Sequence, residues 1–241
     1  MHRPLRSRRQ SRTSSEAARR TMDPRRITVI HATEASMAPV ADAFDRNWSG
    51  AELTQILDDG LSRDRQRQPR LTDNLRRRIH DLAAYAVDCG AEAILFACSA
   101  FGEAIDAAAR QIPIPVLKPN EAMFRAALDC GDELVLLVTF EPAGPAMAAE
   151  FGELAGREQP SARLTTVYVP GALDALRRGD ETTHNSLIAD AAGQVSGADA
   201  VMLGQFSMAC ANADCGRATS VPVFTSPDAA VGQLRGLFHG D

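Results

Sequence analysis

Residues Gly90–Gly102 read GAEAILFACSAFG, a short apolar run that ends on Cys98 and Ser99. A matching stretch, GADAVMLGQFS, occupies Gly197–Ser207, and its apolar run ends on Gln205, which lies 107 positions after Cys98. A short apolar run that is bounded by turn residues is typical of a buried strand. The two stretches therefore indicate that one structural unit occurs twice in the chain.

Two further pairs of segments support this duplication. IPVLKPNEA and VPVFTSPDAA are also related by an offset of 107, and Thr33 in VIHATEASMAP is related to Thr139 in LLVTFEPAGP by an offset of 106. We therefore expect two pseudo-symmetric α/β halves, residues 27–131 and 132–241, after a disordered arginine-rich leader over residues 1–26. Any active site is then expected in the cleft between the halves.

Strands are expected to alternate with helices along both halves. The expected strands cover 27–31, 52–57, a run that ends at 98, 114–118, 133–138, 163–169, 200–204 and 222–224. Such alternation predicts parallel sheets with helices on both faces. Asp58–Ser62 contains an Asp-Gly pair and is expected to be a turn, although Asp58 and Asp59 are also possible ligands.

Ligands of parallel sheets bind beyond the carboxyl ends of the strands, so the polar residues there are the candidate substrate-binding groups. Most are hydroxyls or amides, which suit a small carboxylate-bearing metabolite better than a nucleotide or a polymer. Lys118 is included because it is the single lysine in a chain with 25 arginines. The set is His31, Thr33, Ser99, Lys118, Asn120, Thr139 and Ser207. No GxGxxG, P-loop or His/Asp metal cluster occurs, so neither a cofactor nor a metal is expected.

Composition excludes several classes of partner. Residues 1–26 hold nine arginines, and the rest of the chain carries 17 basic and 29 acidic groups, a poor match for nucleic acid. No apolar run approaches the roughly 18 residues of a membrane helix. The five cysteines lack metal-like spacing and follow no signal peptide, which predicts reduced thiols in the cytoplasm. An Arg- and Ser-rich leader is also similar to a transit peptide.

Cys98 is the candidate acid/base group. At the junction of a strand and a helix, unpaired backbone amides and the helix dipole are expected to lower the thiol pKa from about 8.5. A thiolate beside a bound carboxylate could take a proton from the adjacent carbon. We expect Cys89, Cys130 and Cys215 to be structural.

The duplicated unit and the ACSAFG strand end resemble the aspartate/glutamate/hydantoin racemase superfamily over Ile27–Phe238, and CSAFG, LKPNEAM and QFSMA are similar to a racemase-like branch of it. The resemblance implies two similar α/β domains, a cofactor-independent site in the cleft, and two cysteines that act on opposite faces of one carbon. It also implies a possible homodimer. By the resemblance, Cys98 matches the first cysteine, Ser99 its carboxylate-binding neighbour, and Thr139 the threonine after the first strand of the second half.

The sequence departs from this pattern at two places. Gln205 stands where the second cysteine belongs, and a glutamine has no acid or base function near neutral pH, so we expect it to orient a substrate carboxylate or a water. HATEAS replaces an asparagine-containing turn, which makes His31 an alternative proton carrier. Cys210 is expected to lie in the helix that follows Gln205 and not to replace the missing thiol.

The leading hypothesis is a cofactor-independent racemase or isomerase that acts at the carbon next to the carboxylate of a small amino or organic acid, with Cys98 as acid/base. The alternatives are a single-cysteine decarboxylase, cis–trans isomerase or lyase of the same superfamily, and a non-catalytic small-acid binder.

Overall fold

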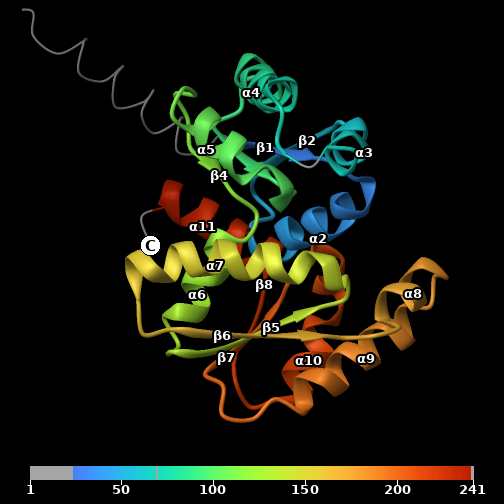
Figure 1. Ribbon diagram of the computed structural model, residues 1–241. Coiled ribbons are helices and arrows are strands. Elements are labelled where there is room, and N and C mark those ends of the chain that lie inside the picture. The colour runs from blue at the N-terminus through green and yellow to red at the C-terminus, as the bar shows by residue number, and fades with distance from the viewer. Residues whose placement is uncertain (1–23, 69, 240–241) are drawn as a thin grey trace, which may run out of the picture.

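Two four-stranded parallel sheets form the framework of the protein, one in each of two lobes (Figure 1). The structure is a computed structural model and describes residues 24–68 and 70–239. The first sheet has the order β2-β1-β3-β4 and the second the order β6-β5-β7-β8. The strands are β1 (Arg26–His31), β2 (Glu52–Leu57), β3 (Ala93–Phe96), β4 (Val116–Leu117), β5 (Glu133–Val138), β6 (Arg163–Tyr168), β7 (Ala200–Leu203) and β8 (Val223–Thr225). The equal strand order confirms the predicted α/β fold.

The strands of the two halves keep one sequence offset. β1 and β5, and likewise β3 and β7, begin 107 residues apart. By this offset of 107, Thr139 is structurally equivalent to Ala32 and not to Thr33. The sequence pairing of Thr33 with Thr139, at an offset of 106, is therefore shifted by one residue from the structural pairing of the strands. The four central strands β1, β3, β5 and β7 are each followed by a 3₁₀ turn: η1 (Glu34–Ser36), η2 (Ser99–Phe101), η3 (Glu141–Ala143) and η4 (Phe206–Ala211).

The central strands β1 and β3 of the first sheet are buried on both faces, as their apolar sequences predict. Successive side chains of a strand point to opposite faces, so Ile27 and Val29 of β1 pack towards α2 (Met37–Asn47), while Ile30 packs towards α4 (Asp73–Asp88) and α5 (Gly102–Ala109). Thr72 caps α4 by accepting a hydrogen bond from the Leu75 amide.

A short helix, α3 (Gly60–Gln66), occupies the segment where the sequence predicts a turn. Tertiary ion pairs hold it in place: Arg78 of α4 binds the Asp58 carboxylate at 2.6 Å and also binds Asp64. Leu61 anchors the helix in the core. Asp58 also accepts a hydrogen bond from the Gly60 amide, so it holds this helix rather than a ligand.

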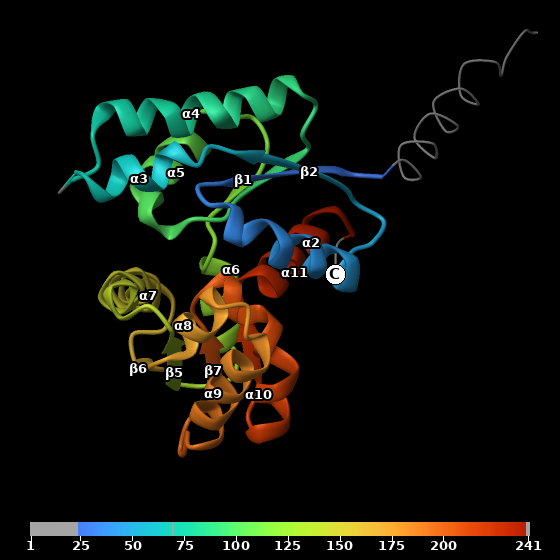
Figure 2. The ribbon, with the colours of Figure 1, turned by 90° about the vertical axis from the view of Figure 1, so that its right-hand side faces the viewer.

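Two helices cover the sheet of the opposite half. α6 (Glu121–Leu128) precedes residue 131 but packs Met123 and Phe124 against the second sheet. α11 (Ser226–His239) packs Ala230 and Val231 with α2 against the first sheet. Figure 2 shows α11 beside α2, with α6 at the junction of the lobes. Residue 131 is therefore the boundary of the sequence repeat. In the folded protein the chain passes from one lobe to the other at two connections, β4–α6 and β8–α11.

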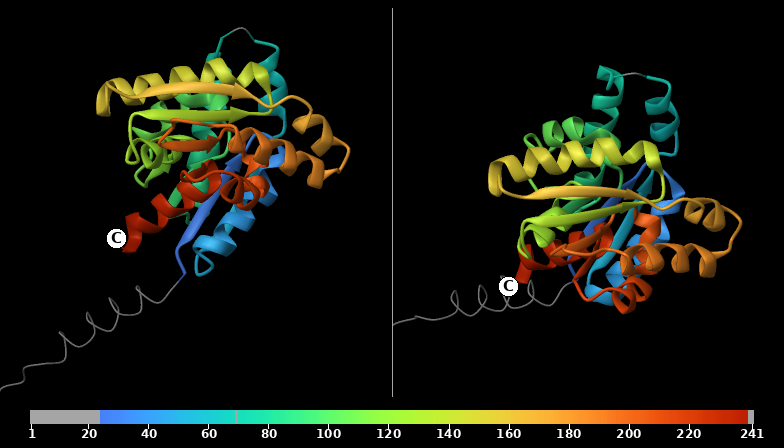
Figure 3. Two further views of the ribbon diagram at one scale, coloured as in Figure 1. Left: turned by 90° about the horizontal axis from the view of Figure 1, so that it is seen from below. Right: turned by 60° about the horizontal axis from the view of Figure 1, so that its bottom comes forward.

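The remaining helices belong to the second lobe. They are α7 (Gly144–Glu158), α8 (Ala172–Arg177), α9 (Glu181–Gly193) and α10 (Asn212–Ala218). Phe124 of α6 and Phe151 of α7 form an edge-to-face pair with ring centroids 5.5 Å apart, a contact that adds about 1 kcal/mol to the burial of the rings. α8 projects from the body of the lobe (Figure 3), after Gly171 turns the chain with a φ of 79°.

The predicted leader falls largely on residues 1–23, which lie outside the described part of the chain. Arg26 already belongs to β1 and pairs with Glu52, and Arg25 pairs with Glu92. Within residues 24–68 and 70–239, the helices are too short or too polar to cross a membrane.

Candidate active site

A cavity of about 410 Å³ lies between the lobes and is lined by residues from both. Its volume is within the usual range for small-molecule pockets. Polar lining residues are Thr33, Ser36, Gln66, Cys98, Ser99, Asn120, Arg177, Gln205 and Ser207. Apolar lining residues are Ala35, Ala97, Pro119, Phe140, Ala143, Met147, Leu173, Gly204 and Phe206. The cavity therefore lies where the turns after the central strands of both sheets meet.

Most of the predicted site residues reach this cavity. The structure brings together Thr33, Cys98, Ser99, Asn120, Gln205 and Ser207. His31, Lys118 and Thr139 do not line it.

Cys98 lies two residues after β3, in an extended conformation at the start of η2. Its side chain is half-buried, and desolvation raises the pKa of the thiol, while the Ala100 amide and the Arg65 guanidinium oppose this effect. The prediction of a lowered pKa is therefore wrong for this state of the site. The physical reason is that η2 contains only three residues, so the dipole beside Cys98 is weak and desolvation dominates.

Gln205 occupies the equivalent position at the start of η4. Its side-chain Oε1 accepts hydrogen bonds from the Thr139 amide at 2.7 Å and from the Thr139 hydroxyl at 3.2 Å. Because a backbone N–H can only donate, the oxygen of Gln205 must face Thr139. Thr139 therefore positions Gln205, whose NH₂ group contacts the Met147 sulfur at 4.0 Å and has a second N–H to donate to a ligand.

His31 reaches the cavity only through Ser36. The ring is fully buried, and this burial lowers its pKa to about 4 against a weaker opposing contact with Gln55. His31 Nδ1 is 2.7 Å from the Ser36 hydroxyl, which also donates to the Thr33 carbonyl at 2.9 Å. Any proton-carrying role of His31 thus passes through Ser36, which sequence reasoning did not select. The available signal was its place in the polar turn HATEAS, directly after a buried strand.

Lys118 forms ion pairs with two carboxylates and does not line the cavity. Its ammonium lies 3.3 Å from Asp106 Oδ1 on α5 and 3.2 Å from Glu121 Oε2 on α6. Burial lowers the Lys118 pKa, but these two carboxylates raise it overall. Lys118 therefore fixes the β4–α6 connection between the lobes.

Asn120 both lines the cavity and joins the two connections. Its Nδ2 donates to Glu150 Oε2 of α7 at 3.0 Å, and its Oδ1 accepts from the Ser226 hydroxyl at 2.9 Å. Ser226 opens α11, so this hydrogen bond links β4–α6 to β8–α11. Burial raises the pKa of Glu150.

The other cysteines do not line this cavity. Cys210 lies in η4, with its sulfur 3.2 Å from the Ser207 carbonyl. Cys215 is buried, as expected of a structural residue, whereas Cys89 and Cys130 are exposed. Among the residues that the structure describes, no group of three or more His, Cys, Asp or Glu side chains could hold a metal ion.

A family model described as Asp/Glu/Hydantoin racemase matches residues 11–234. The chain belongs to this family. A search of curated proteins found no matching relative.

Solved structures of the same fold include two racemases and a decarboxylase. Glutamate racemase isoform RacE1 from Bacillus anthracis is 15% identical, with a TM-score of 0.67 over 90% of this chain and 83% of that one. Allantoin racemase from Klebsiella pneumoniae is 17% identical, with a TM-score of 0.64 over 88% and 87%. A mutant of arylmalonate decarboxylase is 19% identical, with a TM-score of 0.67 over 89% and 94%. At these identities the likeness shows the fold.

Proposed function

We propose that the protein is a cofactor-independent racemase or isomerase that acts at the carbon next to the carboxylate of a small acid, with Cys98 as the acid/base group. The observation that carries this proposal is that Cys98 and Gln205, equivalent residues of the two halves, line one cavity. Membership of the racemase family supports the reaction class.

The proposed step is a proton transfer. The Cys98 thiolate takes the proton from carbon, so that the C–H bond breaks, an S–H bond forms, and the electron pair moves into the carboxylate. The hydroxyls of Ser99 and Ser207 and the Gln205 NH₂ donate hydrogen bonds to the carboxylate oxygens, which gain charge in this step. A proton returned by Cys98 to the same face restores the starting enantiomer, so isomerisation requires that a water protonate the opposite face of the carbon while Cys98 gives its proton to the resulting hydroxide.

Deuterium exchange tests this role of Cys98. Chiral amino, hydroxy and aryl acids are incubated with the protein in deuterated water, and loss of the carbon-bound proton is followed by NMR together with optical rotation. We expect exchange with the parent and with Cys89→Ala, which changes an exposed thiol outside the cavity, and no exchange with Cys98→Ala. Exchange that persists in Cys98→Ala, or that is absent across the whole panel, would contradict the proposal.

Gln205 favours a second candidate, a decarboxylase that uses one thiol. In this reaction the bond to one carboxyl group of a substituted malonate breaks, CO₂ leaves, and the electron pair remains on carbon as an enolate. The Cys98 S–H then protonates that carbon, and solvent restores the thiol. A thiol whose pKa is raised suits the role of proton donor. The fold shared with arylmalonate decarboxylase is compatible with this candidate.

The two candidates are separated by their products. Release of ¹³CO₂ from carboxyl-labelled aryl or alkyl malonates, without exchange at carbon in monocarboxylates, would select the decarboxylase. Ligand binding without either reaction would select a non-catalytic acid binder.

A further inference from the structure

The charge of the cavity wall limits the kind of acid that fits. In the described chain, Arg177 is the one lining side chain that carries a full charge at neutral pH, because neither Asp nor Glu lines the cavity and the pKa of the Cys98 thiol is raised. Arg177 is exposed on α8 and lies 3.5 Å from Asp174, so it is a rim contact for an anion. Inside the cavity a substrate ammonium would meet no lining carboxylate, because Glu141 and Asp174 line the adjoining hollow and not the cavity itself, and an unpaired charge is costly to desolvate.

Three oxygens of the lining residues already accept hydrogen bonds from the protein. Gln205 Oε1 accepts two hydrogen bonds from Thr139, and the Asn120 oxygen accepts one from Ser226. The Thr33 carbonyl accepts from Ser36. The Asn120 NH₂ donates to Glu150, and Gln66 is exposed on α3, so Gln205 is the amide whose NH₂ group, in contact only with the Met147 sulfur at 4.0 Å, is directed to a ligand. The lining hydroxyls can donate or accept, so with one amide NH₂ and no carboxylate the wall suits a ligand that accepts hydrogen bonds better than a cationic donor.

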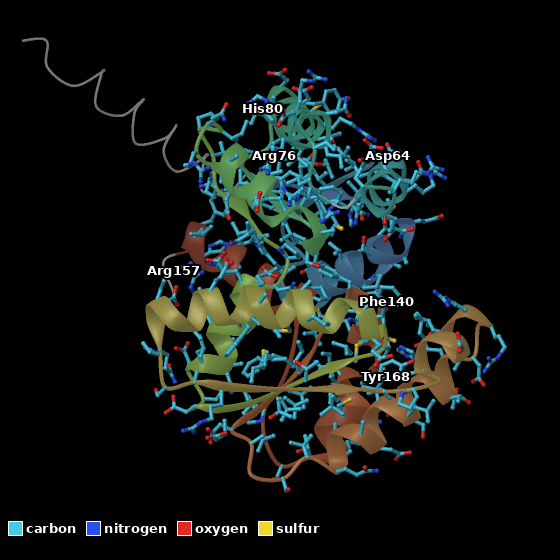
Figure 4. All side chains as sticks on the ribbon, viewed as in Figure 1. Asp64, Arg76, His80, Phe140, Arg157 and Tyr168 are labelled. Atoms are coloured by element: carbon cyan, nitrogen blue, oxygen red, sulfur yellow. The ribbon has the colours of Figure 1, made fainter. Side chains whose placement is uncertain are left out.

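Apolar groups make up most of the remaining surface of the cavity. Phe140 follows β5, lines the cavity, and leaves 47% of its surface exposed. Met147, Leu173 and Phe206 continue the same wall. Figure 4 shows Phe140 and Tyr168 on the side from which α8 projects, and both also line an adjoining hollow. Covering an exposed aromatic ring gains roughly 25 cal/mol per Å² of apolar surface removed from water.

We infer that the substrate is a monocarboxylate with an apolar, aryl-sized group and without an ammonium group. This inference deepens the proposed function and rests on it, because it names the class of acid on which Cys98 would act. The carboxylate would bind the Gln205 NH₂ and the serine hydroxyls, and the apolar group would cover Phe140.

Two matched pairs of ligands test the inference by binding alone. Phenylalanine differs from 3-phenylpropionate, and glutamate from glutarate, by one ammonium group. Isothermal titration of the full chain is expected to show 3-phenylpropionate as the tightest of the four. Each ammonium-bearing acid should bind about tenfold or more weakly than its partner, which corresponds to about 1.4 kcal/mol.

Two variants locate the apolar contact. Phe140→Ala is expected to weaken 3-phenylpropionate by about tenfold, or 1.4 kcal/mol, and to leave glutarate almost unchanged. Tyr85→Ala, which removes an aromatic ring that is 58% exposed on α4 outside the cavity, should change neither affinity.

The inference is overturned if glutamate binds more tightly than glutarate, if phenylalanine binds as tightly as 3-phenylpropionate, or if none of the four acids binds at millimolar concentration. The titrations measure binding and not turnover, so Cys98→Ala is expected to rank the affinities of the four acids in the same order as the parent. Failure of deuterium exchange therefore rejects the proposed function without altering this ranking, whereas a reversed ranking rejects only the substrate class.

Discussion

Two substitutions of Gln205 separate its structural role from its role in the cavity. Thr139 is 2% exposed, and its amide and hydroxyl both donate to Gln205 Oε1. Gln205→Leu leaves these buried donors without an acceptor, at a cost of about 1–3 kcal/mol. We expect the free energy of unfolding to fall by that amount, which lowers Tm by about 2–4 °C per kcal/mol in a chain of this size.

Gln205→Glu keeps an oxygen that can accept both hydrogen bonds and has almost the same size. Its free energy of unfolding is therefore expected to stay within about 1 kcal/mol of the parent. The new carboxylate faces the substrate carboxylate, and like charges about 6 Å apart at an effective dielectric of about 20–40 repel by roughly 1.4–2.8 kcal/mol. The Kd for 3-phenylpropionate should rise about 10- to 100-fold.

Urea unfolding followed by circular dichroism, together with titration calorimetry, measures both effects. The reasoning is refuted if Gln205→Leu is as stable as the parent, or if Gln205→Glu binds the acid with unchanged affinity.

Three further predictions concern other buried groups. Ser226→Ala should lower the free energy of unfolding by about 1–3 kcal/mol, because it leaves the buried Asn120 oxygen unsatisfied, whereas Ser161→Ala at an exposed hydrogen bond should change it by less than about 0.5 kcal/mol in urea unfolding. Alkylation of Cys98 by iodoacetamide, followed by mass spectrometry, should have its midpoint above the ordinary thiol pKa, and a lower midpoint would contradict the burial argument. His31 has a folded-state pKa of about 4 against 6.5 when unfolded. The unfolded state therefore binds more protons in this interval, and up to about 3 kcal/mol of stability should be lost as pH falls from 6.5 to 4. This loss should be absent in His31→Gln; an unchanged pH profile in that variant would refute the assignment.

The duplication and the strand ends could be predicted from the sequence because they depend on local pattern. Buried parallel strands are short apolar runs, and the polar residue that follows each run must lie at the carboxyl edge of a sheet. Cys98 and Gln205 were found in this way, and the cavity holds both of them.

The rest depends on contacts between distant segments. α6 packs on the second sheet and α11 packs on the first. Amphipathic spacing shows that a helix has an apolar face, but it does not show which sheet that face covers. Lys118 ends a strand, a position that predicts a ligand-binding residue, but Asp106 of α5 reaches its ammonium. α3 lacks a strong apolar stripe and depends on Arg78 from a later helix. The Cys98 pKa follows from its desolvation against the core of the first lobe, a tertiary property.

The raised pKa of Cys98 gives the two candidate reactions opposite pH dependences. Proton abstraction needs the thiolate, so the rate of isotope exchange should rise with pH towards the thiol pKa. Protonation of an enolate after loss of CO₂ needs the thiol, so the rate of decarboxylation should be constant at neutral pH and fall as the thiolate forms. The Gln205 amide does not titrate in this range, so both profiles report the same sulfur. The direction of the pH profile therefore identifies the protonation state in which Cys98 works, and with it the reaction that this single thiol supports.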